Sequence, residues 1–205
     1  MATDKLEVLN NALTHLGESN VTTDAENSAV RKLDASMDVV RKRVLRTYPF
    51  PFARARVSMT TVAAVTPYLE QFNYTHTKPA DWLRTIEVSY NGDFERGRIV
   101  SYGSEGGALH SDHDAAWIWY VKDHSTYTEW DALFDDLLAL ELAEHCCLQV
   151  TDSKSLTQMK QDDLKSLRAS AWAISSSDLE QQERPPGNFR GSRYGSNRRS
   201  GYAQF

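Results

Sequence analysis

The spacing of apolar residues changes twice along this chain, and this change restricts the folds that the chain can adopt. Between residues 5 and 48, apolar side chains recur at every third or fourth position, which places them on one face of an α-helix. Between residues 53 and 121, apolar and polar residues alternate with a period of two, which is typical of β-strands. The helical spacing returns from Leu133 to Ile174. The sequence therefore predicts two helices, a sheet and two further helices.

The ends of the first two helices are marked by residues that stop a helix. Gly17 is suited to a left-handed cap on the first helix, and Pro49 and Pro51 end the second. Because helices joined by short connections usually pack antiparallel, we expect each pair to pack on the other. The predicted fold is α+β: a mainly helical four-helix bundle, a small antiparallel β-sheet inserted between helices 2 and 3, and an extended C-terminal arm. In residue numbers, we expect a helical pair in 1–52, the inserted sheet in 53–127, the second helical pair in 128–178 and a flexible basic arm in 179–205.

A hairpin is predicted within the inserted sheet. Asn91-Gly92 follows an apolar strand pattern, and this dipeptide favours a two-residue turn in which both residues have a positive φ. Arg98 to Tyr102 is then the expected returning strand.

Residues 184–205 differ in composition from the rest of the chain. They hold five Arg, four Gly, two Pro, four aromatic residues and no acid, whereas residues 1–183 hold 18 Lys and Arg against 28 Asp and Glu, a formal charge of −10. No apolar period runs through the segment, so we expect it to become ordered on a partner. Interleaved Arg and aromatic residues suit phosphate and base contacts, but they equally suit a protein interface. Composition alone leaves these two interpretations open.

Candidate catalytic and metal-binding residues are few. His110 and His113 lie three positions apart with flanking carboxylates, but no further ligands have a suitable spacing, so we expect a polar loop and no metal, cofactor or catalytic site. The acidic residues of the third predicted helix lie opposite its leucine stripe, and we expect them to form a solvated or subunit-facing surface. These residues are Asp135, Asp136, Glu141 and Glu144.

No apolar run approaches the roughly 20 residues that span a bilayer, and residues 1–5 lack the apolar stretch of a secretory signal.

Six segments, read in order over residues 5–178, together resemble the phage head-to-tail adaptors of the tail tubular protein A type. They are Asn11-Ala-Leu-Thr-His-Leu-Gly17, the segment 39–53 with its Tyr-Pro-Phe-Pro-Phe break, Lys78-Pro-Ala-Asp-Trp-Leu-Arg84, Glu95-Arg-Gly-Arg-Ile99, Tyr120-Val-Lys-Asp-His124 and Trp130-Asp-Ala-Leu-Phe134. One departure is Lys78, where the family often has an apolar residue.

This resemblance implies a structural virion protein of the phage neck that is assembled in the host cytoplasm and has no catalytic activity. Twelve copies would form a ring that binds the portal protein, carries the tail nozzle protein and extends the channel for genomic DNA, with no membrane partner. An acidic wall would let the DNA slide, because it repels phosphates. A DNA-binding module that uses the basic arm for phosphate contacts is the alternative interpretation.

The arm supplies the expected portal-binding residues, because buried aromatic side chains and paired Arg could offset the free energy that ordering the arm costs. They are Phe189, Arg190, Arg193, Tyr194, Arg198, Arg199, Tyr202 and Phe205. Two loops at the expected sheet tips are candidate contacts to the nozzle or to neighbouring subunits. Their residues are Asn91, Gly92, His110 and His113.

Overall fold

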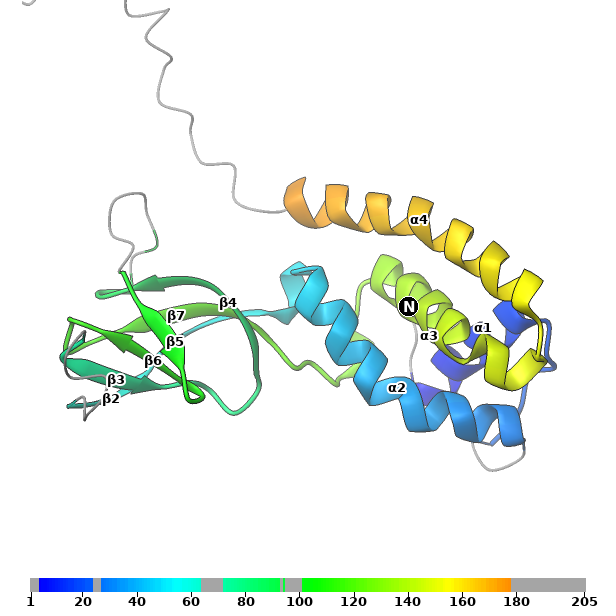
Figure 1. Cartoon of the computed structure of the whole chain (residues 1–205), viewed down its shortest axis with the longest axis horizontal. Helices are drawn as coiled ribbons and strands as arrows, with labels where there is room; N and C mark the ends of the chain where they lie inside the picture. Colours follow the sequence, from blue (N-terminus) through cyan, green and yellow to red (C-terminus); the bar gives the residue numbers. More distant parts are fainter. Residues whose placement is uncertain (1–3, 24–26, 64–71, 93, 95–100, 178–205) are drawn as a thin grey trace, which may run out of the picture.

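The computed structural model describes residues 4–23, 27–63, 72–92, 94 and 101–177. Figure 1 shows the strands gathered at one end of the molecule and the helices at the other. We call these two parts the sheet lobe and the helical lobe. The chain enters the sheet lobe after α2 and returns to the helical lobe before α3.

The first two helices begin and end at residues that suit those positions. Helix α1 (Lys5–Leu16) begins where Asp4 Oδ1 accepts a hydrogen bond from Glu7 N at 2.9 Å, and it ends at Gly17, whose φ of 77° confirms the predicted left-handed cap. Helix α2 (Ser28–Thr47) has Asn27 as its N-cap, and its end just before Pro49 agrees with the predicted stop. A short 3-10 turn, Pro51–Ala53, then leads into the first strand.

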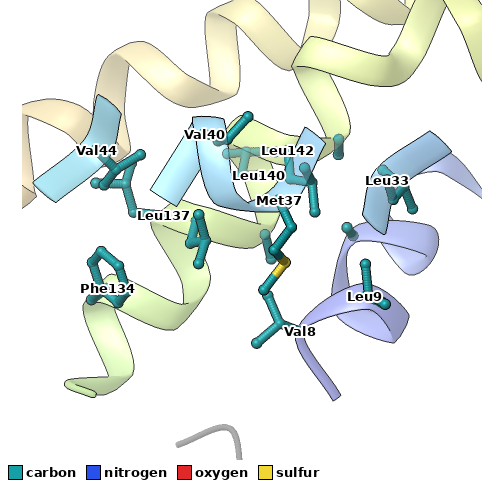
Figure 2. Close-up of a cluster of buried hydrophobic side chains, with 14 of the residues drawn as sticks. Val8, Leu9, Leu33, Met37, Val40, Val44, Phe134, Leu137, Leu140 and Leu142 are labelled. Atoms are coloured by element: carbon teal, nitrogen blue, oxygen red, sulfur yellow. The ribbon is translucent and has the colours of Figure 1, made fainter. Parts of the chain in front are cut away.

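Helix α3 (Ala132–Thr151) forms the centre of the helical lobe. It contacts α1, α2 and α4 (Lys154–Ser177), so its side chains are buried on several faces. In Figure 2, Leu137 and Leu140 of α3 lie among Met37 and Val40 of α2, with Val8 of α1 nearby. The predicted packing of one helical pair on the other is therefore replaced by three helices packed around a fourth.

The predicted mainly helical bundle with one small sheet is wrong. The described residues form an α+β fold with four helices and seven strands in two antiparallel sheets. The three-stranded sheet has the order β1-β7-β4, and the four-stranded sheet has the order β2-β3-β6-β5. The strands are β1 (Arg54–Ser58), β2 (Thr60–Ala63), β3 (Tyr74–Thr77), β4 (Trp82–Ser89), β5 (Gly103–Glu105), β6 (Ala108–Ser111) and β7 (Trp117–Lys122).

The second sheet was not predicted. Alternation of apolar and polar residues indicates that one face of a strand is buried, but it does not indicate which element covers that face. Val88 of β4 and Ile118 and Tyr120 of β7 form a separate small core with Leu109 of β6, so strands of both sheets contribute to it. The strands of the four-stranded sheet have only three or four residues, and β3 and β5 are mainly polar, which gives a weak periodic signal.

The hairpin prediction holds only in part. Gly92 has a φ of 79°, but Asp152 is the sole non-glycine residue in the described part with a positive φ, so Asn91 does not adopt the predicted conformation. Strand β4 pairs with β7. In the expected returning strand, residues 98–100 lie outside the described residues, and Ser101 and Tyr102 are not in a strand.

Candidate functional site

The eight predicted portal-binding residues of the arm lie between positions 189 and 205, outside the described residues. Their role therefore stays a prediction. The other four predicted contact residues lie in the sheet lobe and can be located.

The structure brings the two predicted contact loops together in the sheet lobe. The ring of Tyr90, beside Asn91, stacks on the ring of His113 with 5.2 Å between centroids. The turn is fixed locally because Ser89 Oγ donates to Asn91 Oδ1 at 3.0 Å. A Cβ added at Gly92 would lie 3.2 Å from Trp117 Cδ2, so a larger residue would press on that exposed indole.

His110 and His113 have different surroundings. His113 is exposed, whereas His110 is only 2% exposed and its Nδ1 lies 3.1 Å from Thr75 Oγ1. A third imidazole, His76, is buried beside them, and burial is the main cause that lowers its pKa. In the described ranges, no group of three or more His, Cys, Asp or Glu side chains could hold a metal ion.

Several segments that carry the family resemblance meet where the two lobes join. We call this region the junction; it comprises the end of α2, residues 49–53, the start of β4, and the segment from the end of β7 to the start of α3. Arg41 of α2 is 5% exposed there. Its Nη2 donates to Asp123 Oδ1 at 2.9 Å and its Nη1 to Asp38 Oδ1 at 2.7 Å, so one buried guanidinium links α2 to the residue after β7.

A second arginine fixes the end of α2 to the sheet lobe. Arg84 of β4 donates from Nη1 to the carbonyl oxygens of Arg46 at 3.1 Å and Thr47 at 3.3 Å. These carbonyls belong to the last turn of α2, which carries partial negative charge and lacks partners within the helix. Arg84 therefore acts as a cap supplied by another lobe.

Aromatic rings fill the interior of the junction. Phe50 and Phe52, from the Tyr-Pro-Phe-Pro-Phe break, contact the ring of Phe134 at 5.3 and 5.1 Å between centroids. Trp130 is fully buried, contacts Phe134 at 4.9 Å, and donates from Nε1 to the carbonyl of His124 at 3.2 Å. The break thus does more than end a helix, because its rings pack against the start of α3 and hold the lobes together.

The helical lobe has an open pocket with a volume of about 210 Å³ that sequence reasoning missed. Its lining residues come from α2, its C-terminal cap, α3 and α4, and they are Arg43, Val44, Thr47, Tyr48, Glu141 and Arg168. Glu141 is only 3% exposed, and Asp135 is buried as well, so the expectation that both lie on a solvated or subunit-facing surface is wrong. The reason is that α3 is surrounded by other helices, which cover these two carboxylates, whereas Asp136 is exposed and Glu144 is half-buried.

Two arginines neutralise the buried carboxylate in this pocket. Arg168 Nε donates to Glu141 Oε1 at 2.7 Å, and Arg43 Nη2 donates to Glu141 Oε2 at 3.1 Å. The hydrogen bond to Glu141 is the main cause that raises the pKa of Arg168. The two arginine side chains are 43% and 47% exposed. The pocket therefore has one buried negative charge and two half-exposed positive charges.

The described helices include none that is long and apolar enough to cross a membrane. A comparison of the sequence with protein-family models gives no match, and neither does a comparison with curated proteins.

Proposed function

We propose that this protein is a structural head-to-tail adaptor of a tailed bacteriophage. In this role, twelve copies form a ring that joins the portal to the tail nozzle and extends the DNA channel. The observation that carries the proposal is the junction, because four of the segments that resemble the adaptor family supply its residues. A ring requires each subunit to hold its surfaces at a fixed angle, and the buried Arg41 and the aromatic cluster supply that rigidity.

Charge supports the same role. Residues 1–183 have a formal charge of −10, and acidic groups that face a channel would repel DNA phosphates and let the genome move. Residues 184–205 carry five Arg and no acid, which suits attachment to a partner. The proposed role requires no catalysis and no cofactor.

Deleting residues 184–205 tests the portal attachment. We expect the truncated protein to keep the helical circular dichroism of the full chain and to lose binding to purified cognate portals. A matched variant keeps all five Arg and replaces the four aromatic residues of the arm by Ser. Loss of binding in both variants would assign attachment to the aromatic residues. A truncated protein that joins portals as the full chain does would refute the assignment.

The second candidate function is a DNA-binding module, which the Arg-rich arm favours. It predicts affinity for DNA that falls steeply with salt, because each Arg–phosphate contact releases a counterion. The adaptor proposal predicts weak DNA binding and tight portal binding by the same preparation. Titrations with DNA and with portals at two salt concentrations distinguish the two candidates.

A further inference from the structure

The pocket between α2, α3 and α4 retains much of its capacity to donate hydrogen bonds. A guanidinium has five N–H donors. Arg43 and Arg168 each use one donor for Glu141, which leaves four on each side chain. Because Glu141 is buried and holds both arginines in place, the pocket presents two oriented cations with a net charge of +1. Such an arrangement suits an incoming carboxylate, which pairs with guanidinium groups in a planar geometry.

An aromatic rim adjoins these arginines. The ring of Tyr48, which lines the pocket, contacts the ring of Trp172 of α4 edge-on at 6.4 Å between centroids. Trp172 is 55% exposed, which is unusual for so large an apolar side chain. Trp, Tyr and Arg are the residue types that contribute most to protein–protein binding. Their clustering here indicates that the occupant belongs to a protein.

We infer that the pocket binds a carboxylate side chain presented by a second copy of this chain. The inference rests on the proposed function, since a ring needs contacts between neighbouring copies. In a closed ring, each copy uses two different surfaces, so this pocket must meet another part of the neighbour. Residues 1–183 have ten more acidic than basic residues, so that other part is acidic on average and complements a pocket with a charge of +1.

Three variants of the full-length protein test the inference. The triple variant Arg43→Gln, Glu141→Gln, Arg168→Gln removes the cations without leaving a buried charge unpaired. Glu141→Gln alone keeps both arginines and raises the pocket charge from +1 to +2. The control, Arg31→Gln, removes one exposed charge from α2 outside the pocket, which matches the net charge change of the triple variant.

Self-association is measured by sedimentation velocity over a concentration series and by electron microscopy of collars on cognate portals. Circular dichroism confirms that each variant is folded. We expect the triple variant to associate at least about ten-fold more weakly than wild type, and Glu141→Gln to associate more tightly. The control should stay within about two-fold of wild type. If the pocket served folding alone, the triple variant and Glu141→Gln would not change the strength of self-association in opposite directions.

The remaining outcomes separate this inference from the proposed function. If the triple variant forms the same collars as wild type, the inference is wrong and the adaptor function stands. If the variant self-associates normally but loses portal or DNA binding, the pocket binds that partner and the inference is wrong. If wild type self-associates through the pocket but never joins portals, the inference stands and the adaptor function fails. Wild type that stays monomeric in every setting overturns both.

Discussion

Replacing Arg41 with methionine tests how firmly the two lobes are joined. Arg41 is 5% exposed, and it donates to Asp123 Oδ1 from Nη2 at 2.9 Å and from Nε at 3.3 Å. Methionine keeps most of the length of the side chain and removes its charge. The variant leaves the Asp123 carboxylate, which is attached to the end of β7, without its main partner.

The size of the expected loss of stability depends on how exposed Asp123 and Asp38, the two carboxylates that Arg41 contacts, are to water. Breaking a fully buried ion pair costs about 3–5 kcal/mol. Here Asp123 is partly exposed and keeps Lys42 Nζ at 3.4 Å, so it can recover part of that free energy from water and from Lys42. The contact with Asp38 adds little, because Asp38 is mostly exposed. We therefore expect Arg41→Met to lower the free energy of unfolding by about 2 kcal/mol, close to the value of a charge-assisted hydrogen bond.

Urea unfolding followed by circular dichroism and tryptophan fluorescence measures this change. For a chain of this size, the expected loss corresponds to a fall in Tm of roughly 4–8 °C. Arg31→Met is the control, because Arg31 lies on the same helix and is exposed. A double-mutant cycle with Asp123→Asn isolates the pairwise interaction. If Arg41→Met cost less than about 0.5 kcal/mol, or if the cycle gave no coupling, the salt bridge would not join the lobes.

Three further predictions concern protonation and packing. Burial, followed by the charges of His110 and His113, lowers the pKa of His76. The unfolded chain therefore binds a proton at this side chain at higher pH than the folded protein does, so stability should fall as the pH drops below about 6.5. The fall should be smaller in His76→Gln. Urea midpoints measured at several pH values test this. Burial raises the pKa of Tyr120 to about 12, so its phenol should ionise at a higher pH than exposed tyrosines in an ultraviolet titration. Above pH 10, wild type should therefore lose stability relative to Tyr120→Phe. Phe134→Ala should cost about 3–5 kcal/mol in thermal melts, because it opens a cavity in the junction.

Local signals in the sequence predicted where the first two helices stop, but they did not predict which elements cover the strands. Gly17 and Pro49 act through their own backbone, so their effect can be derived from a single position. The pairing of β3 with β6 joins Thr77 to Ala108 across more than 30 residues, and short, largely polar strands give no periodic signal for such a partner. The expectation of one small sheet failed for that reason.

The pocket was missed because burial on α3 depends on its neighbours. Glu141 lies between leucines at positions 140 and 142, and a single amphipathic stripe would place it toward solvent. The leucines at positions 138 and 142 lie outside the predicted leucine stripe. They were the one feature of the sequence that could have indicated burial of α3 on several faces. No periodicity could reveal that Arg43 and Arg168, on two other helices, converge on the same carboxylate.

The most direct test of the proposed adaptor function is electron microscopy of the purified full-length protein mixed with its cognate portal. The protein alone and the protein with DNA are the controls. The proposal predicts a twelve-fold collar that forms on portals and is absent from both controls. Portals without a collar, together with salt-sensitive binding to DNA, would contradict it and favour the DNA-binding module.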